Sequence, residues 1–156
     1  MSVQRWFWLP LVFASLVSGC TTPSPDCAQL EQDQAVGNAG CLVLRPGAVL
    51  LVQQRLGGAW GIPGGTAEPG ERAACTAARE TREETGLEVR VLEHLQVMDN
   101  GFHIFRCEVA IAAALAPVDG LEIQAAAWIP HDERPSLPWR FPAQRAPVEA
   151  LIQALE

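Results

Sequence analysis

The stretch of residues 65–87 constrains this 156-residue chain more than any other. It contains Glu80, Glu83 and Glu84, whose i, i+3, i+4 spacing places all three side chains on one face of a helix. Carboxylates at this spacing repel one another by roughly 0.2–0.5 kcal/mol per pair, which a purely structural helix rarely tolerates without positive partners. Hard divalent cations such as Mg²⁺ bind carboxylate oxygens and cancel this charge. The spacing therefore predicts a helix over about residues 72–85 that holds a divalent cation.

Glycines flank this predicted helix on both sides. Gly64 and Gly65 precede it in a loop, where backbone without a side chain can approach a ligand closely. Gly86 follows Glu84 by two residues, and glycine is the residue that most often ends a helix in the left-handed conformation. The pattern predicts a loop, a helix and a second loop around the carboxylates.

The same stretch resembles the signature of the Nudix hydrolases. In that signature a glycine is followed after five residues by a glutamate, after seven more by Arg-Glu, and then by two glutamates, a glycine and an aliphatic residue. The chain departs from it at Thr81, where the family usually has an aliphatic residue, and this departure concerns packing rather than the metal site. The matching residues are Gly65, Glu71, Arg79, Glu80, Glu83, Glu84, Gly86 and Leu87.

The resemblance implies a fold and an activity. The expected fold class is α/β, a Nudix-like α/β/α sandwich around a mixed β-sheet. The expected enzyme is a Mg²⁺- or Mn²⁺-dependent hydrolase of a diphosphate linkage, in a nucleoside or other diphosphate joined to a group X. Arg79 is expected to orient a glutamate through an ion pair, with Glu71 as its partner. Family members differ over which glutamate is the general base, so this role stays open. The metal ligands that the resemblance implies are Glu80, Glu83, Glu84 and the carbonyl of Gly64.

Some Nudix enzymes recruit a further acidic residue from a loop beyond the helix. Glu122 is the candidate for this metal-binding role, with Asp119 as the second choice. A solvated loop carboxylate explains Glu122 equally well.

The first 19 residues have the pattern of an export signal. Arg5 precedes an apolar run over residues 6–17, which is short for a membrane-spanning helix of about 20 residues and suits a secretory signal peptide. The run leads into Leu-Val-Ser-Gly-Cys, which resembles a bacterial lipobox with Cys20 as the lipidated residue. A plain cleaved signal and an uncleaved anchor are the alternatives. We expect a lipoprotein signal peptide over residues 1–19, a tether over 20–37 and a hydrolase domain over 38–156.

A lipid on Cys20 would anchor the protein to a membrane of the bacterial cell envelope, facing the periplasm. In enteric-type bacteria an aspartate after the lipidated cysteine resembles an inner-membrane retention signal. Thr21 stands at that position, which favours the outer membrane. The substrates expected there are small-molecule diphosphates: nucleotides, nucleotide sugars or lipid diphosphates.

The charge of the chain excludes several function classes. Its net charge is −7, and all of its 11 basic residues are arginines. An acidic chain without a basic run is a poor binder of nucleic acid, and it does not adhere to an anionic membrane surface by charge. A lysine nucleophile or Schiff base is excluded.

The cysteines suggest disulfide bonds. If Cys20 carries a lipid, an even number remains, which in an exported protein favours disulfides. Zinc binding is disfavoured because no C-x-x-C spacing occurs. We expect the pairs Cys27–Cys41 and Cys75–Cys107, the first because it closes a short loop. Buried free thiols are the alternative for Cys41 and Cys107.

Apolar segments alternate with turn signals along the rest of the chain. Residues 41–44 and 48–53 read as two adjacent strands. Residues 87–97 and 102–113 read as a hairpin around Asn100-Gly101. A loop over 115–124, a short strand over 125–129 and an amphipathic helix over 142–155 complete the pattern.

Two functions from different classes fit this sequence. The first is a metal-dependent diphosphate hydrolase of the cell envelope. The second is a catalytically silent Nudix-fold module that binds a nucleotide or a partner protein. The intact set of glutamates favours the enzyme, because a binding module does not need all three.

Overall fold

The computed structural model of the chain describes residues 34–117 and 120–156. The expected signal peptide, the expected lipid site at Cys20 and most of the expected tether lie outside the described residues. The elements in chain order are β1 (Ala39–Arg45), β2 (Ala48–Gln54), β3 (Trp60–Gly61), β4 (Gly64–Gly65), α1 (Ala73–Thr85), β5 (Val89–Val97), β6 (His103–Val109), β7 (Ile123–Pro130), the short 3-10 helix η2 (Arg134–Ser136) and α2 (Pro142–Leu155).

The strands form a mixed sheet in the order β3-β2-β1-β6-β5, with β4 paired to β1 and β7 paired to β2. β1 and β6 run parallel, and the other pairs are antiparallel. β1 joins the two halves of the sheet, since it pairs with β6 over residues 39–43 and with β2 at Leu44 and Arg45. The predicted mixed sheet is confirmed.

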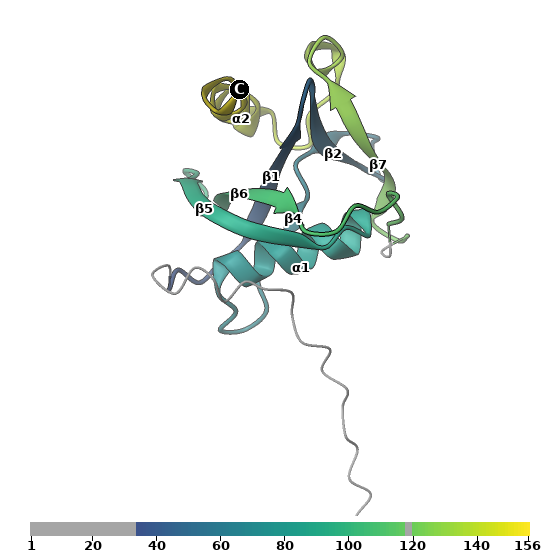
Figure 1. Ribbon diagram of the computed structural model, residues 1–156. Coiled ribbons are helices and arrows are strands. Elements are labelled where there is room, and N and C mark those ends of the chain that lie inside the picture. The colour runs from purple at the N-terminus through teal and green to yellow at the C-terminus, as the bar shows by residue number, and fades with distance from the viewer. Residues whose placement is uncertain (1–33, 118–119) are drawn as a thin grey trace, which may run out of the picture.

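The two helices cover opposite faces of this sheet, with α1 below it and α2 above it in Figure 1. One apolar core joins α1 to the sheet and includes Leu50 and Phe105. A second core joins Val148 and Ile152 of α2 to the other face, where Leu42 lies. β1 is buried over most of its length, as expected of a strand covered on both sides. The expected α/β/α arrangement is therefore present.

The local sequence signals place both helices correctly. α1 ends at Thr85, and Gly86 takes the left-handed conformation with φ 75°. Its four small residues Ala73, Ala74, Ala77 and Ala78 are almost fully buried, which lets the helix lie close to the sheet. α2 spans the predicted residues 142–155. The hairpin around Asn100-Gly101 is also confirmed by the antiparallel pairing of β5 and β6.

Two strand boundaries differ from the prediction. β6 ends at Val109 rather than at residue 113, because its partner β5 begins at Val89, which pairs with Val109. β7 begins at Ile123 rather than at residue 125, because Ile123 pairs with Gln54 beyond a register shift in β2. The pairing partners set both boundaries, and they are distant in sequence.

The predicted disulfide pairs Cys27–Cys41 and Cys75–Cys107 are wrong. The structure instead joins Cys41 to Cys107, with a Cα–Cα distance of 5.5 Å. The two cysteines lie on the parallel neighbours β1 and β6, where Val43 is the register partner of Cys107. Cys75 is also disulfide-bonded, and Cys27 lies outside the described residues. A preference for short loops failed here because the parallel strand pair brings residues 66 positions apart into contact.

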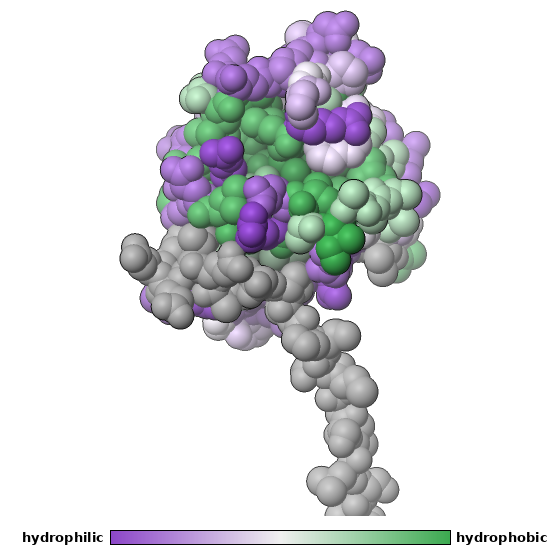
Figure 2. Space-filling model, in the orientation of Figure 1, coloured by the Kyte–Doolittle hydropathy of each residue, from purple (hydrophilic) through white to green (hydrophobic). Residues whose placement is uncertain are grey.

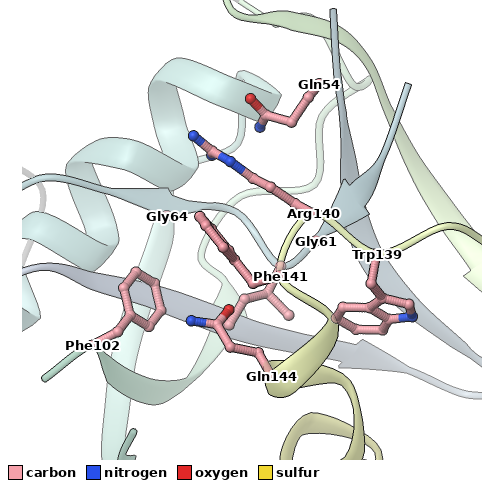
Figure 3. Close-up of a pocket in the computed structure, with 9 residues that line it drawn as sticks. Gln54, Gly61, Gly64, Phe102, Trp139, Arg140, Phe141 and Gln144 are labelled. Atoms are coloured by element: carbon pink, nitrogen blue, oxygen red, sulfur yellow. The ribbon is translucent and has the colours of Figure 1, made fainter. Parts of the chain in front are cut away.

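Hydrophobic side chains gather in the middle of the face shown in Figure 2, and hydrophilic ones lie along its upper edge. No helix among residues 34–117 and 120–156 has both the length and the apolar character needed to cross a membrane. A cavity opens where β4 meets the start of α2 (Figure 3). The side chains of Gln54 and Arg140 lie at one end of this cavity, and those of Phe102 and Gln144 lie at the other.

Candidate active site

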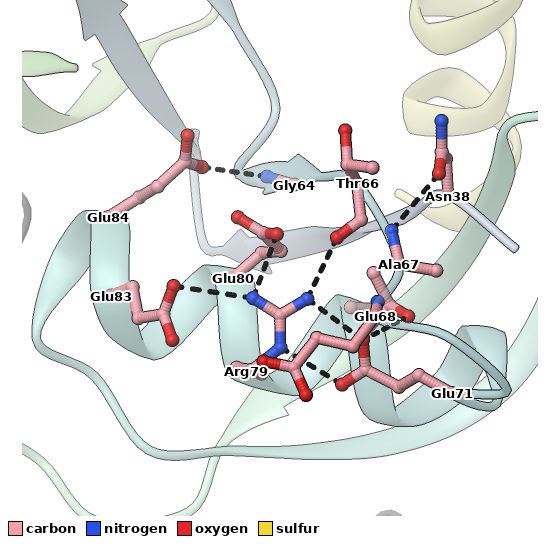
Figure 4. Close-up of polar contacts among 12 residues, drawn as sticks. Asn38, Gly64, Thr66, Ala67, Glu68, Glu71, Arg79, Glu80, Glu83 and Glu84 are labelled. Carbon is pink, nitrogen blue, oxygen red and sulfur yellow. Dashed lines mark hydrogen bonds and ion pairs between the residues drawn. The ribbon is translucent and has the colours of Figure 1, made fainter.

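Arg79 is the centre of a cluster of carboxylates on α1 and in the loop just before it (Figure 4). Its Nε and Nη2 atoms donate to the two carboxylate oxygens of Glu71, each at 2.9 Å. Its Nη1 atom donates to Glu80 at 2.9 Å and to Glu83 at 3.3 Å. Nη2 also donates to the carbonyl oxygen of Thr66 at 2.9 Å. The ion pair that the resemblance implied between Arg79 and Glu71 is therefore present, and it is bidentate, the strongest geometry for such a pair.

Glu71 is held from several sides at the entrance to α1. Its Oε2 atom accepts hydrogen bonds from the backbone N–H of Glu68 at 2.9 Å and from the hydroxyl of Thr76 at 3.0 Å. Burial opposes its charged form, but the bonds from Arg79, Glu68 and Thr76 outweigh burial and lower the pKa of Glu71. The same contacts with Glu71 raise the pKa of Arg79. Glu71 thus stays ionised and keeps Arg79 in one orientation.

Glu84 has a different environment from the other glutamates. It is 4% exposed, and its Oε2 atom accepts a hydrogen bond from the backbone N–H of Gly64 at 2.7 Å. Burial raises the pKa of Glu84 to about 8, while the bond from Gly64 and the charge of Arg140 partly oppose this shift. A buried carboxylate of this kind gains from a positive charge placed beside it. Burial likewise raises the pKa of Glu80.

Close backbone packing explains why glycines precede α1. Gly64 of β4 faces Gly40 of β1, and a Cβ atom on Gly64 would lie 2.5 Å from the Cα atom of Gly40. A Cβ atom on Gly65 would lie 2.5 Å from the carboxylate of Glu80. The glycines therefore let the loop lie directly against β1 and the carboxylate of Glu80. Their predicted close approach to a ligand stays a prediction.

The loop carboxylate Glu122 lies near enough to Glu84 to act on it electrostatically. Its negative charge contributes to the raised pKa of Glu84. Glu122 is exposed and lines a second cavity together with Arg140. The other loop candidate, Asp119, is not among the described residues.

The carboxylates suit a hard divalent cation by their chemistry. Glu80, Glu83 and Glu84 offer oxygen ligands on one helix face, and the buried Glu84 has its pKa raised by the lack of water around it. Within residues 34–117 and 120–156, no three His, Cys, Asp or Glu side chains converge as a ready metal site. Glu80 and Glu83 are turned to Arg79, whereas Glu84 is turned to Gly64. The carboxylate oxygens are the kind of ligand that this cation binds. In this structure they bind Arg79 and the N–H of Gly64 instead.

Thr81, the departure from the signature, lies on the buried side of α1. It is fully buried, and its hydroxyl donates to the carbonyl oxygen of Ala77 at 2.7 Å. This bond satisfies the hydroxyl inside an apolar core, so a threonine is accommodated where the family usually has an aliphatic residue.

The sequence analysis missed the residues that line the neighbouring cavity. Phe102, Phe141 and Gln144 line it together with Gln54 and Arg140. These residues come from three separate parts of the chain, and none belongs to the signature. In the sequence, Arg140 is marked only by its place just before the predicted C-terminal helix. In the structure its neighbour Trp139 pairs with Trp60 of β3.

Comparison with known proteins identifies the family. The family model described as NUDIX domain matches residues 35–151, which is most of the chain. The chain belongs to the Nudix family. The match begins near the point where Ala35 accepts a hydrogen bond from the first residue of α1, Ala73.

Among the curated relatives, Nudix hydrolase 5 of Arabidopsis thaliana is 25% identical over 150 residues, covering 88% of this chain and 46% of the relative. The CMP-5'-(N-acetyl-N-hydroxy-3-aminopropyl)phosphonate hydrolase of Streptomyces rubellomurinus is 35% identical over 85 residues, covering 50% of this chain and 41% of the relative. The chain thus spans less than half the length of these two curated relatives.

The solved structure of an ADP-ribose pyrophosphatase from Streptococcus suis has the same Nudix fold. It superposes with a TM-score of 0.60 at 19% identity, covering 71% of this chain and 86% of that chain. At this identity the likeness concerns the fold. Family and fold therefore agree with the signature read from the sequence.

Proposed function

We propose that this Nudix domain hydrolyses a diphosphate linkage in a small molecule with the help of Mg²⁺ or Mn²⁺. The observation that carries this proposal is the carboxylate cluster of α1, in which Arg79 binds Glu71, Glu80 and Glu83 while the buried Glu84 lies against Gly64. The family and the names of the relatives, which are hydrolases and a pyrophosphatase, support the same chemistry.

The residues of the cluster have separable tasks in this reaction. Glu80, Glu83 and Glu84 would hold the cation, with the carbonyl of Gly64 as a further ligand and Glu122 as a candidate. A bound divalent cation supplies charge neutralisation of the phosphates and lowers the pKa of a water molecule. Arg79 is fixed by Glu71 and holds the carboxylates of Glu80 and Glu83 in their positions.

Proton transfer falls to the carboxylates. A carboxylate that is ionised and lies within reach of the attacking water can take its proton. Glu80, Glu83 and Glu84 are the carboxylates that a cation bound at this helix face would bring near that water. The general base is therefore sought among the glutamates of α1, and pH-rate profiles of single Glu→Gln variants would assign it.

We also propose that the protein is a lipoprotein of the bacterial cell envelope. The support is the sequence of residues 1–20, with its short apolar run and its lipobox-like end at Cys20. The disulfide between Cys41 and Cys107 is compatible with an oxidising compartment. Incorporation of radiolabelled palmitate into the wild type, and its loss in Cys20→Ala, is the expected result; incorporation that persists in Cys20→Ala would contradict the assignment of Cys20.

The activity is tested with a panel of nucleotide, nucleotide sugar and lipid diphosphates in the presence of Mg²⁺ or Mn²⁺. We expect the wild type to split the diphosphate linkage of at least one class into two phosphate-containing products, and EDTA, Glu83→Gln and Glu84→Gln each to reduce kcat at least about 100-fold. Glu93→Gln is the matched control, because Glu93 is an exposed glutamate on β5 outside the cluster. Wild type and variants that are equally inert would favour the silent binding module instead.

A further inference from the structure

Two cavities lie on either side of the same two side chains, Gln54 and Arg140. The first is the cavity of Figure 3, which contains the rings of Phe102 and Phe141. The second is lined by Leu56, Ala59, Leu121 and Glu122 together with Gln54 and Arg140. We refer to the two cavities together as the groove: they share two polar side chains, and one is lined by aromatic rings and the other by aliphatic side chains.

The centre of the groove is fixed by the sheet and borders the carboxylate cluster. The backbone N–H of Arg140 donates to the carbonyl oxygen of Trp60 in β3 at 2.8 Å. Gln54 is the last residue of β2, and its N–H donates to the carbonyl oxygen of Ala59 at 2.9 Å. The charge of Arg140 acts on Glu84, whose carboxylate binds Gly64 in the wall of the first cavity. A phosphate at the centre of the groove would therefore lie between Arg140 and the proposed metal ligands.

Arg140 is the guanidinium best placed to bind that phosphate. The donors of Arg79 are engaged by three carboxylates and the carbonyl of Thr66. Arg55 donates to the carbonyl oxygens of Gly120 and Ile123. Arg140 is exposed and lines both cavities. Guanidinium groups bind phosphate oxygens through paired, charge-assisted hydrogen bonds.

The aliphatic end of the groove consists of two leucines on neighbouring loops. Leu56 is 90% exposed and Leu121 is 88% exposed. The loops are tied together, since the N–H of Arg55 donates to the carbonyl oxygen of Glu122 at 2.8 Å and its Nε to that of Gly120 at 2.9 Å. Single exposed leucines are common on protein surfaces. Here two of them line the same cavity as Arg140, whose guanidinium lies 5.1 Å from the centre of the Phe141 ring, so an apolar wall adjoins the phosphate position.

We propose that Leu56, Ala59 and Leu121 form a binding site for an uncharged, apolar group that is esterified to one phosphate of the substrate. Arg140 and Gln54 contact the diphosphate, and the organic group on the other phosphate extends from there towards the rings of Phe102 and Phe141. The proposal rests on the proposed hydrolysis and narrows its substrate to a diphosphate esterified at both ends, with one apolar end.

The reaction on such a substrate is balanced by water alone. The oxygen of water bonds to one phosphorus, and the bond from that phosphorus to the bridging oxygen breaks. The bridging oxygen leaves with the second phosphate, so two phosphate monoesters form and the two protons of the water pass to solvent. Neither organic group is oxidised or reduced.

The test compares two substrates that differ only in apolar length: the β-methyl and β-butyl esters of adenosine diphosphate. Both have the same charge, so a difference in kcat/KM reports on the apolar site. Partial burial of three additional methylenes predicts about a tenfold higher kcat/KM for the butyl ester with the purified full chain and Mg²⁺. The double variant Leu56→Ser/Leu121→Ser should bring this ratio close to one, chiefly by lowering kcat/KM for the butyl ester.

Two further variants separate the parts of the groove. Ile111→Ser is the matched control, because Ile111 is also a large exposed hydrophobic residue and lines neither cavity of the groove. It should preserve the tenfold ratio. Arg140→Gln should lower kcat/KM for both esters by a similar factor, since both substrates carry the same diphosphate.

Several results would overturn the proposal. The methyl and butyl esters could be hydrolysed equally well by the wild type, or the double leucine variant could retain the preference. The variant could also lose binding to phosphatidylglycerol vesicles with its ratio unchanged, which would assign the leucines to a membrane contact. If neither ester is hydrolysed, the proposed activity on this class of substrate fails. Calorimetry then tests the apolar site separately. About tenfold tighter binding of the butyl ester than of the methyl ester would support the site, and equal binding would contradict it.

Discussion

Removal of the disulfide between Cys41 and Cys107 should destabilise the domain strongly. The bond joins the parallel strands β1 and β6 across a sequence separation of 66 residues. In the chain-entropy description, a cross-link that closes a loop of this length lowers the entropy of the unfolded chain enough to stabilise the fold by about 4 kcal/mol. The free energy of unfolding of a domain of this size is about 5–15 kcal/mol, so this one bond supplies a large share of the stability.

The perturbation is the double variant Cys41→Ala/Cys107→Ala, with Cys75 left intact in both proteins. Urea unfolding, followed by tryptophan fluorescence, should give a free energy of unfolding lower by about 4 kcal/mol and a melting temperature lower by about 10–20 °C. The single variant Cys107→Ala is the control, because it removes the same bond and retains the sulfur of Cys41. It should lose nearly as much stability as the double variant.

Two results would refute this reasoning. The first is a double variant whose unfolding free energy lies within about 1 kcal/mol of the wild type. The second is peptide mapping under non-reducing conditions that finds Cys41 bonded to a cysteine other than Cys107. The first result would mean that the cross-link contributes little to stability, and the second would mean that it does not join β1 to β6.

Three further predictions concern the carboxylate cluster. In EDTA, the unfolding free energy should fall as the pH rises from 5 to 8, by up to about 1.4 kcal/mol per pH unit. The reason is that folded Glu84 keeps its proton up to about pH 8, whereas unfolded Glu84 loses it near pH 4.5. Urea unfolding of Glu84→Gln should show a much smaller dependence on pH, and an unchanged dependence would contradict the raised pKa. Arg79→Lys should lower kcat about 100-fold and stability by about 1–2 kcal/mol, because a lysine cannot bind Glu71 in the bidentate manner; wild-type kcat would argue against a positioning role. Gly65→Ala should lower kcat more than about tenfold with the fold retained by circular dichroism, since its Cβ atom would displace Glu80; unimpaired turnover would exclude Glu80 from the reaction.

Local sequence signals predicted the helices, the hairpins and the carboxylate face of α1. These features depend on short-range spacing. Gly86 ends α1 because a glycine takes the left-handed conformation without strain, and Gly101 allows the hairpin turn after Asn100 for the same reason. The resemblance added the pairing of Arg79 with Glu71, which the spacing could not establish. The structure then supplied the geometry of that pair.

The features that the sequence did not predict depend on long-range pairing. The disulfide joins strands that are adjacent only because β6 runs parallel to β1, and no local pattern reports that pairing. The groove brings Gln54, Leu121 and Arg140 together from the ends of β2, a loop and the segment before α2. Each is an ordinary surface residue when read alone, so only the fold reveals their common position.

Hydrolysis in water enriched in oxygen-18 tests the central claim most directly. A diphosphate substrate found in the activity panel would be turned over with Mg²⁺, and the products would be analysed by mass spectrometry. The account predicts a single labelled oxygen in one of the two phosphate products, and no detectable labelled product with Glu83→Gln or in EDTA. Products without the label, or equal labelling by wild type and Glu83→Gln, would contradict water attack on phosphorus at the carboxylate cluster of α1.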